Sequence, residues 1–129
     1  RALLDPERQS AIQLLQENSY SWLLRASSQR LSGRGLILID PPYEPYNQYM
    51  VWNLYLLRHL RRNWPNACIA LWYPCFDAAQ RGSLYHRVQD LQVGDALVAE
   101  VTVQRSSKER LDSSGVMLVN PPPEAQAQL

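Results

Sequence analysis

The sequence predicts an α/β fold in which a largely parallel sheet ends in an antiparallel pair of strands. Residues 35–39 form a continuous apolar run, Gly-Leu-Ile-Leu-Ile, which is typical of a parallel strand buried on both faces. Strand and helix patterns alternate from there to residue 89. Two strand patterns then follow one another without a helix between them, and this order indicates an α/β sandwich with a terminal antiparallel pair.

Before the apolar run, the sequence predicts a helix, a short strand and a loop. Asp5 followed by Pro6 is typical of a helix start, because Asp caps free backbone N–H groups and Pro suits the first helical position. An apolar side at helical spacing extends this helix over residues 6–17. Residues 21–25 are a predicted short strand around an apolar cluster, and the polar residues 26–34 are a predicted loop.

After the apolar run, helices and strands alternate. A wide apolar face predicts a long helix. A strand is predicted after this helix, and Pro74 is expected to end that strand. A run of three prolines ends the last strand, and the residues beyond it are a predicted frayed tail. The predicted elements are a helix over 46–63, a strand over 67–73, a helix over 76–89, and strands over 96–104 and 116–120.

Composition indicates one globular domain. The chain has 129 residues, of which 46% are apolar and 19% charged, and no apolar run is long enough to cross a bilayer. A net charge of +1 limits any nucleic-acid surface to a local patch. Two cysteines and two histidines at these spacings are too few for a zinc site, so no metal is expected. We expect Cys68 and Cys75 to be reduced thiols of a cytoplasmic protein.

The most informative motif is Asp40-Pro41-Pro42-Tyr43, which directly follows the apolar run. It matches the active-site turn of enzymes that methylate exocyclic amino groups on bases. In an open α/β sheet, ligands bind beyond the carboxyl ends of the strands, and the motif stands at such an end. The motif can also be a rigid turn that ends a strand, with Tyr43 as a packing residue.

The residue types of this motif suit the chemistry. An exocyclic amine such as adenine N6 is a poor nucleophile, because its lone pair is delocalised into the ring. Asp40 and the carbonyl of Pro41 can each accept one N–H and hold the nitrogen nearer to tetrahedral geometry. Pro42 stiffens the turn, and Tyr43 offers a ring face on which a flipped-out base can stack. Most of the rate would come from positioning and electrostatics.

Longer stretches around this motif resemble one family over nearly the whole chain. They are Arg34-Gly35-Leu36-Ile37-Leu38-Ile39-Asp40-Pro41-Pro42-Tyr43-Glu44, Ala70-Leu71-Trp72-Tyr73-Pro74 and Ser114-Gly115-Val116-Met117-Leu118-Val119-Asn120-Pro121-Pro122. These stretches are similar to the bacterial 23S ribosomal RNA adenine-N6 methyltransferase family typified by RlmJ. The resemblance implies a Rossmann-like methyltransferase that uses S-adenosylmethionine and binds RNA, with a seven-stranded sheet whose last strand is antiparallel.

The same resemblance implies that residues 1–129 are a single partial methyltransferase domain whose N-terminal strands are missing. The family's glycine-rich cofactor loop has no counterpart in this sequence, and Leu3 stands where an acidic residue holds the cofactor ribose. Ser27 stands where the family has an Asp beside the cofactor adenine. Asp40 and Ser27 are therefore the candidate cofactor contacts of a chain that keeps the base-holding residues and lacks most cofactor-holding ones.

We expect the chain to be a fragment that is inactive alone and lacks an N-terminal half. A partner polypeptide that supplies the missing strands and a decayed gene product are the two alternatives. The missing first strand would leave unpaired strand edges, which invite self-association. Two other functions stay open, a non-catalytic RNA-binding or interaction module and an amino-methyltransferase of another substrate such as DNA adenine or a protein glutamine.

Three further positions are candidate substrate contacts. Arg58 and Arg62, near the end of the long helix, can bind RNA phosphates or complement the helix C-terminus. Tyr73 ends a strand on the active-site side and is expected to line the pocket.

Asn120-Pro121-Pro122 resembles a second catalytic turn, but too little chain follows it to complete a sheet, and Pro123 replaces the stacking aromatic. A structural role is predicted for that turn.

Overall fold

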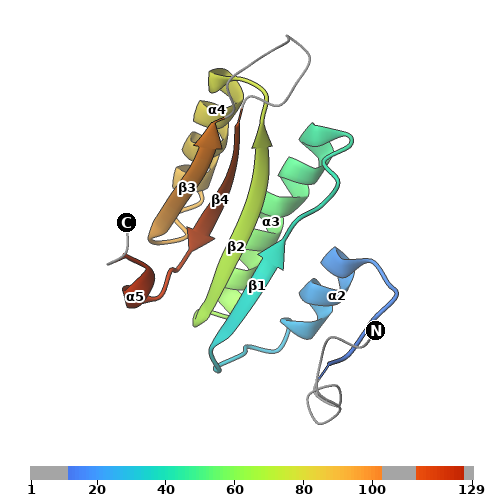
Figure 1. The fold of residues 1–129 in the computed structure, drawn as a ribbon. Helices are drawn as coiled ribbons and strands as arrows, with labels where there is room; N and C mark the ends of the chain where they lie inside the picture. Colours follow the sequence, from blue (N-terminus) through green and yellow to red (C-terminus); the bar gives the residue numbers. More distant parts are fainter. Residues whose placement is uncertain (1–11, 103–112, 127–129) are drawn as a thin grey trace, which may run out of the picture.

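The computed structural model describes residues 12–102 and 113–126 (Figure 1). Helices alternate with strands as far as α4, and two consecutive strands follow. The elements are α2 (Ser19–Ala26), β1 (Gly35–Ile39), α3 (Tyr46–Asn63), β2 (Ala67–Cys75), α4 (Ala78–Asp90), β3 (Ala96–Thr102), β4 (Ser113–Val119) and α5 (Pro123–Gln126).

The four strands form one mixed sheet in the order β1-β2-β4-β3. β1 pairs parallel with β2, with Ile37 opposite Ile69, while β4 is antiparallel to both β2 and β3. The predicted α/β class with a terminal antiparallel pair is therefore confirmed. Asp40 follows the last residue of β1, so it lies at the carboxyl edge of the parallel pair.

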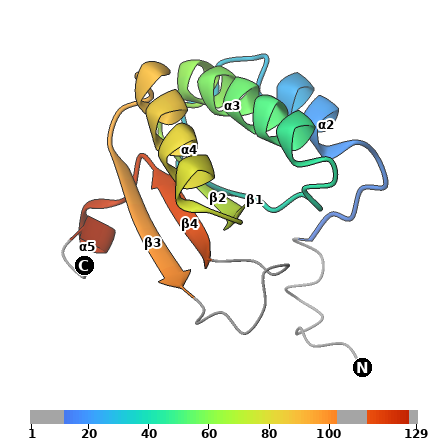
Figure 2. The same cartoon turned by 90° about the horizontal axis from the view of Figure 1, so that it is seen from above.

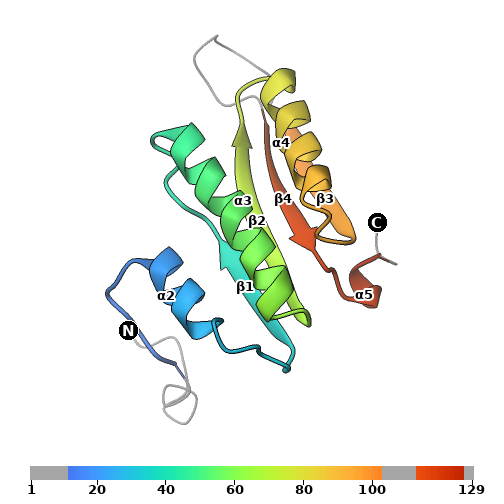
Figure 3. The same cartoon turned by 180° about the vertical axis from the view of Figure 1, so that it is seen from behind.

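Helices α3 and α4 cover one face of this sheet, and α2 lies beside α3 beyond the β1 edge (Figures 2 and 3). Alternate strand residues point toward the helices and form the core with the inner faces of α3 and α4. Burying these apolar side chains is the main stabilising term of the fold. The core includes Ile37, Ile39, Leu56, Leu57, Leu60, Ile69, Leu71, Leu84, Val88, Met117 and Val119.

The opposite face of the sheet is apolar and is not covered by α2, α3 or α4, and the short helix α5 lies at one end of it (Figure 2). Leu36 and Leu38 are 72% and 68% exposed. The register places Leu38 beside Ala70, and Ala70 beside Leu118 of β4, so this apolar surface continues across the sheet. The prediction that residues 35–39 are buried on both faces is therefore wrong for the face that holds the two leucines.

The largest error of the sequence analysis concerns residues 21–25, which form part of helix α2 rather than a strand. Asn18 caps this helix, and its side-chain oxygen accepts a hydrogen bond from the backbone N–H of Ser21 at 2.9 Å. Tyr20, Leu23 and Leu24 are spaced at helical intervals and pack against the core. A short apolar cluster fits both helical and strand periods, and here the cap and the packing favour the helix.

Other predicted boundaries move by a few residues. β2 continues through Pro74 to Cys75, because β1 stops opposite Leu71 and leaves this end of β2 paired on one side only. β4 starts at Ser113, and α5 forms where a tail was predicted. Residues 12–17 are not helical, while residues 6–11, Leu3 and residues 103–104 lie outside the described residues.

Three further findings concern membrane-spanning helices, metal sites and the two cysteines. No helix within the described residues is long and apolar enough to cross a membrane. The same residues contain no group of three or more His, Cys, Asp or Glu side chains that could hold a metal ion. Cys68 and Cys75 do not form a disulfide.

Gly115 and Gly82 provide a matched test of close packing. A Cβ on Gly115 would lie 2.5 Å from the ring and hydroxyl of Tyr73, whereas a Cβ on Gly82 in α4 would meet nothing within 4 Å. We expect Gly115→Ala to lower the free energy of unfolding by about 1–3 kcal/mol, because the buried ring has no room to move. Gly82→Ala should raise it by about 0.5–1 kcal/mol by favouring the helix. Urea denaturation measures both, and equal effects would contradict this packing.

Candidate active site

Asp40 lines a cavity of about 230 Å³ at the carboxyl end of β1. α2 contributes Ser19, Tyr20 and Leu23 to this cavity, and α3 contributes Leu56. The carboxylate is exposed, whereas the wall beside it is largely apolar and aromatic. Asp40 and Pro41 therefore both line a small concave space, and their roles as acceptors for an amine stay predictions.

The turn after Asp40 is fixed by Tyr43. Its backbone has φ +56°, in the left-handed region that a residue with a Cβ seldom adopts. The Tyr43 hydroxyl donates a short hydrogen bond to the carbonyl oxygen of Trp72 in β2. Such backbone conformations persist where the surrounding structure imposes them, and here the anchored side chain does so.

A buried relay of hydrogen bonds extends from Tyr43 to α2. Asn53 of α3, which is 0% exposed, donates from Nδ2 to the Tyr43 hydroxyl at 3.0 Å. The hydroxyl of Tyr20 donates to Asn53 Oδ1 at 2.6 Å. This Tyr20–Asn53–Tyr43–Trp72 relay joins α2, α3, the turn and β2. Tyr20 and Asn53 were not predicted as site residues, because polar partners this far apart in the chain leave no local pattern in the sequence.

Burial keeps both tyrosines of this relay in the neutral, hydrogen-donating form. It raises the pKa of Tyr20 to about 12, with a smaller contribution from Tyr49. Burial also raises the pKa of Tyr43, and the nearby Tyr20 adds to the increase. The relay is therefore intact at neutral pH.

The ring of Tyr43 is packed rather than open. The residue is 5% exposed, and its ring centroid lies 5.7 Å from that of Trp72 and 5.9 Å from that of Tyr46. This geometry matches the packing role that the sequence analysis kept as an alternative. Stacking of a base on Tyr43 stays a prediction, and the aromatic side chain that lines the Asp40 cavity is Tyr20.

Tyr73 belongs to a separate polar cluster beneath α4. The residue is 0% exposed, and its hydroxyl donates to Glu100 Oε1 at 2.8 Å and lies 3.0 Å from the Tyr85 hydroxyl. Arg81 Nη1 donates to Glu100 Oε2 at 3.2 Å. The Tyr73 side chain does not line the Asp40 cavity in the described residues, so its predicted contact with substrate stays a prediction.

The charge of Glu100 is stabilised by this cluster. Burial alone would raise the pKa of Glu100, but hydrogen bonds from the two tyrosines and from Arg81 outweigh it and hold the pKa below its ordinary value. Burial raises the pKa of Tyr73, and its bonds to Tyr85 and Glu100 raise it further. The cluster therefore ties β2, β3 and α4 together around one carboxylate.

Ser27 lies at the other end of α2 from the cavity. It caps the helix C-terminus, is 1% exposed, and donates from its hydroxyl to the carbonyl oxygen of Leu23 at 2.5 Å. Its polar group is thus used within the helix. The α2 residues that line the Asp40 cavity are instead Ser19, Tyr20 and Leu23, mostly at the helix N-terminus.

Arg58 and Arg62 lie toward the far end of α3. This helix has 18 residues, which corresponds to a length of about 27 Å, and it starts next to the turn. Arg61, between them, donates to the carbonyl oxygens of Val93 at 2.8 Å and Pro65 at 2.6 Å. Arg61 is therefore structural, whereas the side chains of Arg58 and Arg62 are exposed.

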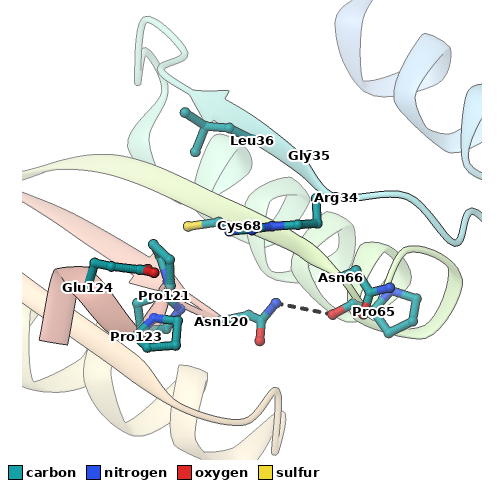
Figure 4. A pocket seen from close by; sticks show the side chains of 11 residues that line it. Arg34, Gly35, Leu36, Pro65, Asn66, Cys68, Asn120, Pro121, Pro123 and Glu124 are labelled. Atoms are coloured by element: carbon teal, nitrogen blue, oxygen red, sulfur yellow. Dashed lines mark hydrogen bonds between the residues drawn. The ribbon is translucent and has the colours of Figure 1, made fainter.

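Asn120 has a structural role at the opposite end of the sheet from Asp40. Its Nδ2 donates to the carbonyl oxygens of Pro65 at 3.1 Å and Ala67 at 3.0 Å, which fixes the end of β4 against the start of β2. A larger cavity of about 750 Å³ lies here, with Arg34, Cys68 and Asn120 around it (Figure 4). The hydrogen bonds of Asn120 agree with the prediction that Asn120-Pro121-Pro122 has a structural role.

Comparisons with known proteins point to one family. The family model described as "Ribosomal RNA large subunit methyltransferase D, RlmJ" matches residues 1–129. "Ribosomal RNA large subunit methyltransferase J" of Escherichia coli strain K12 is 32% identical over 107 residues, which are 82% of this chain and 38% of that protein. The protein of the same name from Haemophilus influenzae is 29% identical over 97 residues, 74% of this chain and 34% of that protein.

The fold comparison agrees with this result. A crystal structure of a protein from Legionella pneumophila matches with a TM-score of 0.68 and 19% identity, over 84% of this chain and 40% of that one. At this identity the likeness shows the fold alone. The chain spans less than two-fifths of the length of both curated relatives that it matches.

Tyr43→Phe tests the relay. The change removes one hydroxyl and leaves Asn53 Nδ2 and the Trp72 carbonyl without their partner. We expect the free energy of unfolding to fall by about 1–3 kcal/mol, because both groups stay buried. Tyr55→Phe on α3 is the control, since Tyr55 is 55% exposed, and it should change stability by less than about 0.5 kcal/mol. Equal urea midpoints for the two variants would argue against the relay.

Glu100→Gln tests the second cluster through pH. Because the folded-state pKa of Glu100 is lowered, its contribution to stability is present above the unfolded pKa and is lost as pH falls through the folded value. We expect the variant to be less stable than the parent by about 1–3 kcal/mol at pH 7. The difference should shrink as pH falls below 4.5, the ordinary pKa of the group. A difference that is constant from pH 7 to pH 3 would contradict this assignment.

Proposed function

The chain belongs to the family described as Ribosomal RNA large subunit methyltransferase D, RlmJ, and from that membership we propose that it holds the acceptor base in methylation of adenine N6 in 23S ribosomal RNA. The observation that carries the proposal is the position of Asp40 and Pro41. Both residues line a small cavity at the carboxyl end of β1, and a hydrogen-bonded turn follows them. Ligands of open α/β sheets bind at this edge.

Asp40 and Pro41 act as hydrogen-bond acceptors for the amine in this proposal. The Asp40 carboxylate accepts one N–H of the amine and the Pro41 carbonyl accepts the other, so that the lone pair points away from the base plane. Pro42 and the anchored Tyr43 keep these acceptors in place, which makes Tyr43 a positioning residue here. Tyr20 offers ring surface for the base in the same cavity.

The methyl donor is proposed to be S-adenosylmethionine, which supplies an electrophilic methyl group when bound. The described residues fit only part of such a molecule, because the cavity at Asp40 measures about 230 Å³ and sites for drug-sized ligands span about 300–1,000 Å³. Asp40 is the residue of this chain that we place nearest the transferred group. We propose that the remaining contacts come from family sequence outside this chain, and that the isolated chain is inactive.

The open sheet face suggests how that additional sequence would associate. Among the described residues, one edge of β1 has no strand partner, and this edge and the exposed Leu36 and Leu38 offer backbone groups and apolar area to another segment. We propose an N-terminal half as the occupant, with self-association as the alternative. We propose that the protein acts in the cytoplasm and that its substrate there is ribosomal RNA.

A second candidate function is a non-catalytic module that binds RNA. The observation that favours it is the surface of α3, which carries arginines and aromatic side chains but no acidic residue. Methylation of DNA adenine would use the same turn, and the family match favours RNA over it.

Asp40→Ala tests the catalytic proposal in a longer protein that joins this domain to the remaining family sequence. We expect methyl transfer to 23S ribosomal RNA to fall at least about 100-fold, because an acceptor aimed at the reacting group is lost. Transfer of labelled methyl groups from S-adenosylmethionine measures the effect. Glu44→Gln, which changes an exposed carboxylate four residues away, should keep most of the activity. Full activity of Asp40→Ala with an unchanged thermal transition would rule the proposal out.

A further inference from the structure

Helix α3 carries an unusual set of solvent-facing side chains. Its sequence, Tyr46–Asn63, has three arginines and one histidine and no aspartate or glutamate. On the side away from the core, Trp52 is 45% exposed and Tyr55 is 55% exposed. Their rings meet edge to face with centroids 6.4 Å apart. Two large aromatic side chains in contact with water on one helix need an explanation that core packing does not give.

These aromatics continue into the exposed arginines of the same helix. Trp52, Tyr55, Arg58 and Arg62 follow each other at intervals of three, three and four residues, so they share one face. We name these four residues the α3 stripe. Within the described residues, neither Arg58 nor Arg62 forms an ion pair with an acidic side chain. Both guanidinium groups are available to an anionic partner.

The stripe is connected to the Asp40 cavity through Tyr20. The ring of Trp52 lies 6.3 Å from that of Tyr20, and Tyr20 lines the cavity together with Asp40. Tyr20 therefore contacts both the cavity and the first residue of the stripe. Leu56 of α3, which lies between Tyr55 and Arg58 in the sequence, also lines this cavity.

The chemistry of the stripe fits unpaired RNA. Unstacked bases bind to exposed aromatic rings, and arginine binds phosphate groups through paired N–H donors. Base-paired RNA keeps its base faces covered and would use only the arginines. A neutral protein surface would cover the aromatics equally well, but it would leave the uncompensated positive charge of α3 unexplained.

We propose that the α3 stripe binds unpaired RNA next to the base held at Asp40, with bases on Trp52 and Tyr55 and phosphates on Arg58 and Arg62. The location next to a target base rests on the proposed function, whereas the binding of unpaired RNA by the stripe does not. The stripe would hold flanking nucleotides and set which loops of an RNA can present a base to the cavity.

The test is RNA binding by the chain and its variants. A fluorescently labelled, unpaired 12-nucleotide RNA of mixed sequence is titrated, and anisotropy gives the affinity at several salt concentrations. We expect the double variant Trp52→Ala/Tyr55→Ala to lose at least about tenfold in affinity, since stacking platforms supply much of single-strand binding. Arg58→Ala and Arg62→Ala should each weaken binding and reduce the salt slope by about 0.7, the value for one phosphate of a single strand.

Matched controls come from exposed residues on other surfaces. Arg87→Ala on α4 removes an exposed arginine, and Leu36→Ala removes exposed apolar area from the open sheet face. Both variants should bind within about twofold of the parent, and circular dichroism should show that every variant is folded. A duplex of the same sequence should bind more weakly than the single strand.

Three results would overturn the proposal. One is a parent chain that shows no RNA affinity, and another is a set of stripe variants that bind as the controls do. The third is self-association that disappears in Trp52→Ala/Tyr55→Ala, which would make the stripe a protein interface. The two proposals have separate readouts, because Asp40→Ala is tested by methyl transfer in the longer protein and the stripe variants are tested by RNA affinity of this chain. If Asp40→Ala contradicted the methyltransferase proposal while the stripe variants still weakened RNA binding, the proposal that the stripe binds RNA would stand.

Discussion

The hydroxyl of Tyr43 fixes the shape of the candidate active site. β1 ends opposite Leu71, and Tyr43 bonds the carbonyl of Trp72, the next residue of β2, where β1 no longer continues. The same hydroxyl accepts the amide of Asn53, whose own oxygen accepts a bond from Tyr20. β2 and α3 thus both bond one oxygen atom inside the protein, where an unpaired polar group is costly, and α2 is joined to them through Asn53. The direction of Asp40 depends on this arrangement, because only the stiff Pro41-Pro42 segment separates the two residues.

The elements with a clear local signal were predicted well, and those defined by distant partners were not. The apolar run of β1 and the wide apolar face of α3 gave the observed bounds of both elements. α2 was missed because its apolar cluster is short, although Asn18 in front of it was a readable cap signal. The burial of Tyr43 depends on partners 10 and 29 residues away, so no pattern around the motif could distinguish stacking from packing.

The apolar run of β1 also shows what composition can and cannot predict. The sequence indicated burial on both faces, and the inner face, with Ile37 and Ile39, is buried. Leu36 and Leu38 are as apolar as the isoleucines, yet α3 and α4 both lie on the other side of the sheet. The apolar run therefore indicates that the strand is suited to burial on both faces. The described residues bury one of these faces. The two relatives described above are longer than this chain, which spans 38% of one and 34% of the other.

Helix α3 connects the two parts of the proposed function because its faces have different partners. Its inner face packs on the sheet through Leu56, Leu57 and Leu60, which fixes the rotation of the helix about its own axis. Asn53 on this face anchors the turn, while Trp52, one residue earlier, lies about 100° around the helix and contacts Tyr20. Any rotation or slip that would move the α3 stripe would also break the bond from Asn53 to Tyr43. The distance between the stripe and Asp40 is therefore set by the hydrophobic core, so a nucleotide bound to the stripe as proposed would be held in a fixed position relative to Asp40.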